Sequence, residues 1–143
     1  MEKQEYEKLL SLITEQNPEQ LKEYKKRHEK ECHRDFVSFI DDYISSHGFT
    51  RAFIINKANL TNYGYRILDG TKHTKNRNLI LRICLAMGMN LDDTQKALKF
   101  YNMRLLDDAL FRDQIIIACI VTGKTAIDIH DLLCKAGEES IYA

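Results

Sequence analysis

Proline and glycine are scarce in this sequence of 143 residues, which holds one proline and six glycines. Both interrupt helices, proline because it lacks a backbone N–H donor and glycine because its backbone loses more entropy on ordering. No segment shows the alternation of apolar and polar residues that is typical of a half-buried strand. The sequence therefore predicts an all-α protein.

A long hydrophobic run is also missing. The most apolar stretch, Gln114–Val121, is far shorter than the roughly 20 residues that a membrane-spanning helix needs. The charged start of the chain, Met1–Glu5, is not followed by the apolar segment of a signal peptide. We expect no membrane partner and a cytoplasmic location.

A complete set of metal ligands is absent as well. Four cysteines are spread along the chain without a Cys-x-x-Cys pair, which is typical of reduced thiols in a cytoplasmic protein: Cys32, Cys84, Cys119 and Cys134. His28, Cys32 and His33 have the spacing of one helix face, but a structural zinc site needs four ligands. We therefore expect neither a metal ion nor another cofactor.

Groups that would support catalysis are missing too. Gly123-Lys124-Thr125 imitates the end of a phosphate-binding loop, but Ala118 stands where that motif needs its first glycine. The acidic pairs Asp41-Asp42 and Asp107-Asp108 are adjacent in sequence, so their side chains diverge on a helix. No set of residues forms a coherent catalytic group, and we expect that the protein is not an enzyme.

The chain as a whole has no net charge, because it holds 21 basic and 21 acidic residues. Its individual segments are charged. Residues 50–82 hold seven basic side chains and one acidic, a net of +6. Residues 1–49 hold eight basic and 11 acidic, and residues 83–143 hold six and nine, so each flank has a net of −3. Positive charge concentrated in one segment attracts a polyanion to that segment.

Helical periodicity divides the chain into three parts. Helices are expected at residues 4–15 and 18–32, the second starting at Asn17-Pro18. A new apolar face runs from Phe36 to Ile44 and ends at Gly48, a candidate for a left-handed C-cap. We interpret residues 1–34 as a charged helical extension, 35–103 as a helix-turn-helix domain, and 104–143 as a C-terminal helical pair packed on the same core.

The segment from Thr50 to Gly70 carries the functional prediction. Thr50 and Thr61 are N-cap candidates for two short helices, about 51–58 and 62–68, with Phe53 facing inward in the first. A turn at Asn59-Leu60 joins the helices. Such a pair suits the major groove of DNA, because the second helix can enter it while the first crosses the backbone. Four more helices are expected behind it, at about 77–87, 91–101, 107–121 and 125–135.

Gly64 lies inside the second of these short helices, where it lowers helix stability by about 1 kcal/mol relative to alanine. A glycine at such a position often permits a close approach. We expect that approach to be either to the preceding helix or to the DNA backbone.

A family resemblance follows from these residues. The segments Gly48-Phe49-Thr50, Ala58-Asn59-Leu60-Thr61 and Tyr65-Arg66-Ile67-Leu68-Asp69-Gly70-Thr71-Lys72 resemble the XRE-type (phage-repressor or Cro-like) helix-turn-helix family. The likeness is strongest to small members found mostly in Gram-positive bacteria, and it extends to Leu91–Leu98 and Phe111–Ile117. In total it covers about residues 36–142.

The resemblance implies a repressor-like helix-turn-helix bundle with additional N- and C-terminal helices. Two positions depart from the family pattern. Asn59 replaces the usual glycine of the turn, although asparagine tolerates a left-handed backbone. Thr74 stands where a proline is usual. Both departures leave the target of recognition open.

The expected DNA contacts divide into two groups. Asparagine can bond adenine and arginine can bond guanine in the major groove, so the recognition helix would meet bases or nearby phosphates through Thr61, Asn62, Tyr63, Tyr65 and Arg66. Basic residues around it would hold the phosphate backbone: Arg51, Lys72, His73, Lys75 and Arg77.

Two functions remain open from the sequence. The first is a sequence-specific transcriptional regulator that binds double-stranded DNA, with homodimer contacts through helices outside the motif. The second is a protein-interaction adaptor in signalling or phage defence, which keeps the repressor-like fold without DNA readout and binds a protein partner.

Overall fold

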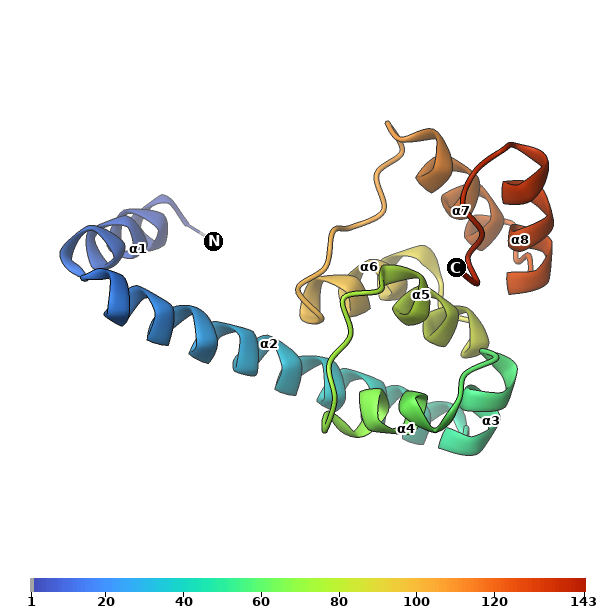
Figure 1. Ribbon diagram of the computed structural model, residues 1–143, viewed down its shortest axis with the longest axis horizontal. Helices are drawn as coiled ribbons and strands as arrows, with labels where there is room; N and C mark the ends of the chain where they lie inside the picture. Colours follow the sequence, from blue (N-terminus) through green and yellow to red (C-terminus); the bar gives the residue numbers. More distant parts are fainter. Residues whose placement is uncertain (1) are drawn as a thin grey trace.

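The computed structural model describes residues 2–143, and over that range its regular secondary structure consists of helices only (Figure 1). This confirms the predicted all-α class. The eight helices are α1 (Lys3–Glu15), α2 (Pro18–His47), α3 (Arg51–Lys57), α4 (Asn62–Asp69), α5 (Arg77–Ala86), α6 (Leu91–Phe100), α7 (Phe111–Val121) and α8 (Ala126–Lys135). Between residues 2 and 143, no helix combines the length and apolar character required to cross a bilayer.

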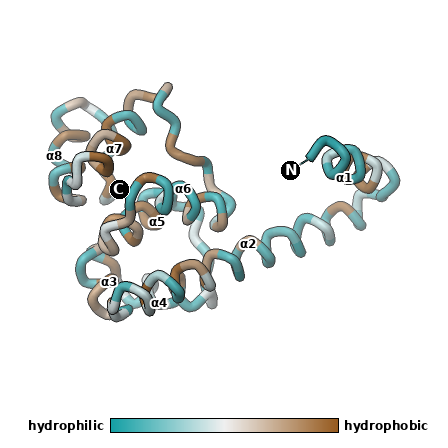
Figure 2. The backbone as a smooth tube through the Cα atoms, turned by 180° about the vertical axis from the view of Figure 1, so that it is seen from behind, coloured by the Kyte–Doolittle hydropathy of each residue, from teal (hydrophilic) through white to brown (hydrophobic). Residues whose placement is uncertain are grey.

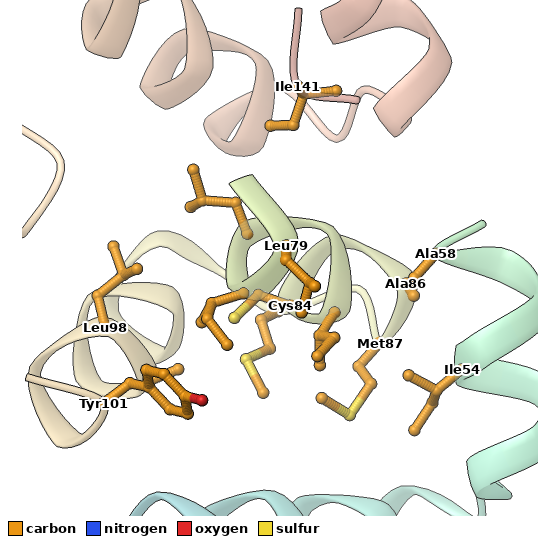
Figure 3. Close-up of a cluster of buried hydrophobic side chains, with 14 of the residues drawn as sticks. Ile54, Ala58, Leu79, Cys84, Ala86, Met87, Leu98, Tyr101 and Ile141 are labelled. Atoms are coloured by element: carbon orange, nitrogen blue, oxygen red, sulfur yellow. The ribbon is translucent and has the colours of Figure 1, made fainter. Parts of the chain in front are cut away.

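The core is built around α5, in which eight of ten residues are buried. A helix that is apolar on all sides is stable only when other elements surround it. Helices α3, α6 and α8 pack against α5, while α2 packs against α4 and α6. Figure 3 shows side chains from α3, from the end of α6 and from the C-terminal segment directed toward α5.

Helix α2 is one continuous helix of 30 residues, so the predicted break near residues 32–36 is wrong. Its start agrees with the prediction, because Asn17 and Gln20 form a capping box and Pro18 occupies the first turn. Gly48 ends the helix at φ 70°. No glycine or proline interrupts the chain between these points, so the charged residues 33–35 simply continue the helix.

The first half of α2 projects from the rest of the molecule and carries α1 at its far end (Figure 1). Phe36 is the first buried residue of α2, and no residue of α1 is buried. The 18 residues from Pro18 to Asp35 span about 27 Å at the rise of an α-helix. We call residues 3–35 the arm and residues 36–143 the body. The projecting part of α2 is mostly hydrophilic (Figure 2).

Helix α7 begins at Phe111 rather than near Asp107, where the sequence analysis placed its start. The side chain of Asp107 accepts a hydrogen bond from the backbone N–H of Ala109 at 2.9 Å, and the backbone N–H of Asp107 donates to Asp113 at 3.0 Å. These local bonds hold the backbone in a turn, because a short acidic side chain competes with helical hydrogen bonds.

The C-terminal segment closes the body. Ile141 is fully buried next to the core, and the Asn78 side chain on α5 donates to the carbonyl of Ala143 at 3.4 Å. Arg112 on α7 donates to the side-chain oxygen of Asn78 at 2.7 Å and to the carbonyl of Glu139 at 3.0 Å. Helices α7 and α8 are therefore tied to α5 through the last residues of the chain.

Candidate nucleic-acid interface

Two short helices, α3 and α4, form the candidate interface. The hydroxyl of Thr50 accepts the backbone N–H of Phe53 at 3.1 Å, which confirms the predicted N-cap of α3. Asn59 has a left-handed backbone with φ 56°, and this lets the chain reverse between the helices. Thr61 occupies the predicted N-cap position of α4, but its side chain is exposed and forms no capping hydrogen bond.

Gly64 sets the distance between the two helices. A Cβ atom at this position would lie 2.6 Å from Cδ1 of Ile55 on α3 and 2.9 Å from Cβ of Leu60 in the turn. Both separations are shorter than van der Waals contact. Gly64 therefore permits the close approach of α4 to α3, which was one of the two approaches expected from the sequence.

Helix α4 has a buried face and an exposed face. Ile67 and Leu68 are fully buried, whereas Asn62, Tyr63 and Arg66 are exposed. The spacing of these three exposed residues, i, i+1 and i+4, places them on one side of the helix. This side of α4 is therefore exposed to solvent.

Two aromatic residues lie differently from expectation. Tyr65 is half-buried and packs against the core, which leaves less of its ring for DNA than the sequence analysis assumed. Phe53 was expected to face inward, but 45% of it is exposed. Its ring stacks on that of Phe49 with a centroid distance of 5.7 Å, and the ammonium of Lys57 lies 5.4 Å from its centroid.

The loop after α4 is held to that helix by side-chain hydrogen bonds. The Tyr63 hydroxyl donates to the carbonyl of His73 at 2.7 Å. The carboxylate of Asp69 accepts from the hydroxyl and the backbone N–H of Thr71 at 2.7 and 2.8 Å, and these bonds lower the pKa of Asp69. Residues 71–75 therefore have a defined position beside the exposed face of α4.

Five of the seven basic side chains of the central segment are exposed: Arg51, Lys57, Arg66, Lys72 and Lys75. Asp69 is the exposed acid among them. Arg51 also forms an ion pair with Asp41 on α2, with 3.0 Å between the atoms and both side chains more than 40% exposed. Such an exposed pair contributes little to stability, so Arg51 can exchange this partner for a phosphate at small cost.

Arg77 does not contribute to this surface, and its predicted phosphate contact is contradicted by its internal bonds. Its guanidinium pairs with the buried carboxylate of Asp113 and donates to the carbonyls of Arg104 and Leu105 at 3.4 and 3.3 Å. Arg82, the seventh basic residue, is buried with its guanidinium 5.5 Å from the ring centroid of Tyr142. The positive charge of the segment is therefore divided between the surface and the core.

His73 is exposed, and its ring packs on the body. The ring stacks on Tyr101, at 4.5 Å between centroids, and lies 4.7 Å from the ring of His33 on α2. The residue can still approach a phosphate through the outer edge of its ring, but its orientation is fixed by these aromatic neighbours.

The other residues considered as ligands do not gather into a metal site. Within residues 2–143, no group of three or more histidine, cysteine or acidic side chains has the geometry to hold a metal ion. His28 and Cys32 lie together, with 3.7 Å between Nε2 and Sγ. All four cysteines are free, and burial raises the pKa of Cys84 to about 12.

A comparison of the chain with known protein families, with curated proteins and with solved structures finds no match.

Proposed function

We propose that the protein binds double-stranded DNA in a sequence-specific way, with α4 as the recognition helix, and acts as a transcriptional regulator. The observation that supports this most directly is the outward face of α4. It presents Asn62 and Arg66, the residue types that bond adenine and guanine bidentately, on a helix of eight residues.

The surroundings of α4 fit the phosphate backbone on both sides of a groove. Lys72 and Lys75 lie in the loop that Tyr63 anchors to α4, and Arg51 and Lys57 belong to α3. In helix-turn-helix complexes, the helix before the recognition helix crosses the backbone. The exposed cations therefore occur on the two elements that would meet phosphates.

The arm supports the formation of a homodimer. Helix α1 exposes large apolar side chains at helical spacing, among them Tyr6, Leu10 and Ile13. A second copy of the same helix would cover them. Because a two-fold protein reads a two-fold DNA site, this pairing would place two α4 helices on successive half-sites. Sedimentation of the full chain and of a Leu10→Asp, Ile13→Asp variant tests it, since only the variant should stay monomeric.

The DNA proposal is tested by selection from random duplex DNA, followed by fluorescence titration of the enriched sequence. The Arg66→Ala, Lys72→Ala variant should lose at least tenfold in affinity. Lys96→Ala, Lys135→Ala is a matched control, because it removes the same charge from exposed positions on α6 and α8. Failure to enrich any sequence, or an equal loss in both variants, would contradict the proposal.

The alternative is a protein-interaction adaptor on the same helical body. Its supporting observation is again the apolar side of α1, which a partner helix could cover instead of a second copy. A partner that copurifies after nuclease treatment and is lost in the Leu10→Asp, Ile13→Asp variant would favour this function, provided that no DNA sequence is enriched.

A further inference from the structure

A cleft of about 930 Å³ lies between the arm and the body. One wall is the projecting part of α2, and the other walls are the loop at residues 73–77 and the segment at residues 101–104. The volume is typical of sites that enclose small molecules. It is separate from the exposed face of α4, although Lys75 borders both regions.

The lining of this cleft is strongly positive. Six basic side chains surround it: Lys25, Lys26, Lys30, Lys75, Arg77 and Arg104. The acid on the same wall is Glu29, whose carboxylate lies 4.0 Å from Lys25 on the adjacent turn. Arg77 is already paired with Asp113. Four cations, two of them on the arm, therefore face the cleft without a salt bridge among the described residues.

Three packed rings belong to the same cleft. His33 meets Tyr101 edge to face at 5.3 Å, and His73 stacks on Tyr101. The Tyr101 hydroxyl accepts the backbone N–H of Thr74 at 2.9 Å, which fixes the loop. Nε2 of His33 is buried and has no hydrogen-bond partner within residues 2–143. A buried polar atom without a partner costs free energy, so a turn of the His33 ring that brings Nε2 to a ligand would remove this cost.

We propose that this cleft binds the multivalent phosphate group of a small molecule. The concentrated lysines neutralise its charge, and charge-assisted hydrogen bonds from ammonium groups to phosphate oxygens are strong. Nε2 of His33 is closed off from solvent, so it bonds to a phosphate oxygen only when the ring turns toward the cleft.

Binding at the cleft has a route to α4. The carbonyl of His73 accepts the hydroxyl of Tyr63, so a ligand that moves the His73 loop also changes the position of a residue on the recognition helix. This consequence rests on the proposed DNA binding, whereas the anion site itself does not. The phosphate would then act as an effector of DNA affinity.

Calorimetric titration of the full chain at low salt tests the site, with inorganic tripolyphosphate as the first probe and adenosine and guanosine triphosphates as the others. We expect binding with a dissociation constant below 1 mM for at least one of them. Equal affinities would assign recognition to the phosphate chain alone, and tighter binding of a nucleotide would show that the base is held as well. Both results support the proposal.

The Lys26→Gln, Lys30→Gln variant should bind at least tenfold more weakly, and Lys96→Gln, Lys135→Gln should change affinity less than twofold. A shift of the His33 ring signals in nitrogen-15 NMR on addition of tripolyphosphate locates the ligand without any substitution. Absence of binding to all three probes, an equal loss in both variants, or unmoved His33 signals would overturn the inference. Binding in the cleft by a protein that selects no DNA would leave the inference standing and contradict only the proposed function.

Discussion

Gly64 is the residue at which local preference and packing conflict. Alanine in its place would gain about 1 kcal/mol of helix propensity, but overpacking costs typically about 1–3 kcal/mol. Because the new Cβ would lie 2.9 Å from Cβ of Leu60, an atom that cannot rotate away, packing should dominate. We expect Gly64→Ala to lower the free energy of unfolding by about 1 kcal/mol in urea titration.

Adding Ile55→Val to Gly64→Ala provides the control. This second change removes the Cδ1 atom nearest to the new methyl group, so it should recover part of the loss. A double-mutant cycle that shows no coupling between the two positions would contradict this packing explanation.

Asp113 is a buried acid whose side chain holds Arg77 and the turn before α7. Burial alone would raise its pKa, but the bonds from Arg77 and from the backbone N–H of Asp107 outweigh this and hold the pKa below its usual range. Asp113→Asn should therefore cost about 3 kcal/mol, because it leaves the guanidinium without its charge partner.

The pH dependence of this effect follows from the lowered pKa. The stabilisation is present above the unfolded-state value near 3.8 and is lost as the pH falls through the folded-state pKa. Urea midpoints of the wild type and Asp113→Asn should differ most at neutral pH and converge in acid. A constant difference would contradict the assignment.

His33 should give stability a second pH dependence at milder values. Burial and the neighbouring His73 lower its pKa below the ordinary 6.5, so the unfolded chain takes up the proton first. His33 makes no contribution to this pH dependence above 6.5, where it is neutral in both states, and destabilises the fold increasingly as the pH falls from 6.5 through the folded-state pKa. Other ionisable groups line the same region: Tyr101, Glu29, Lys26 and Lys30. The His33→Gln variant isolates the contribution of the histidine, because the free energy of unfolding should change less between pH 7 and 5.5 than in the wild type.

At the scale of the element, α2 combines two parts with different energetic roles. The part from Phe36 onward is packed into the body, while the part before it is held by helix propensity and its N-cap, except at His33, whose ring contacts His73 and Tyr101. Glu23→Pro should break the helix within the arm, since an internal proline costs about 3 kcal/mol. The free energy of unfolding of the body should stay within about 0.5 kcal/mol of the wild type.

Trypsin digestion measures the local effect. Cleavage at Lys25 and Lys26 should become much faster in Glu23→Pro, whereas Glu23→Ala should keep the wild-type rate because alanine preserves the helix. A large drop in the urea midpoint of Glu23→Pro would show that the arm also stabilises the body.

Helix ends were predictable where one residue decides them. Asn17 and Thr50 cap the helices whose starts the sequence predicts there, because a capping bond lies within three residues. Errors arose where a boundary depends on distant packing or on competing side-chain bonds. There are two examples: the helix break predicted between residues 32 and 36, where α2 is continuous, and the start of α7.

At the scale of the whole molecule, the exposed residues of α4 were predictable because helical periodicity separates its two faces. The role of Arg77 was not, since its partner Asp113 is 36 residues away and neither residue differs locally from a surface residue. The ring cluster of His33, His73 and Tyr101 was equally unpredictable from the sequence. Its members come from three elements, and no sequence spacing joins them.

The salt dependence of DNA binding is a prediction for the whole molecule. If all five exposed cations near α4 contact phosphates, the slope of log affinity against log salt should be about −4.5 per protomer. Arg77 should add nothing to it. Titrations at several potassium chloride concentrations measure the slope, and a value near zero would exclude a phosphate-based interface.

Because α2 is one continuous helix, its projecting part moves as a rigid rod. A tilt of 10° about Phe36 would displace the far end of this helix by about 5 Å, given its length of about 27 Å beyond that point. Each residue inserted into the projecting part would advance its tip by about 1.5 Å and turn it by about 100°. In a dimer joined through the arms, the distance between the two bodies and the rotation of one relative to the other would thus depend on the number of residues in the projecting part of α2.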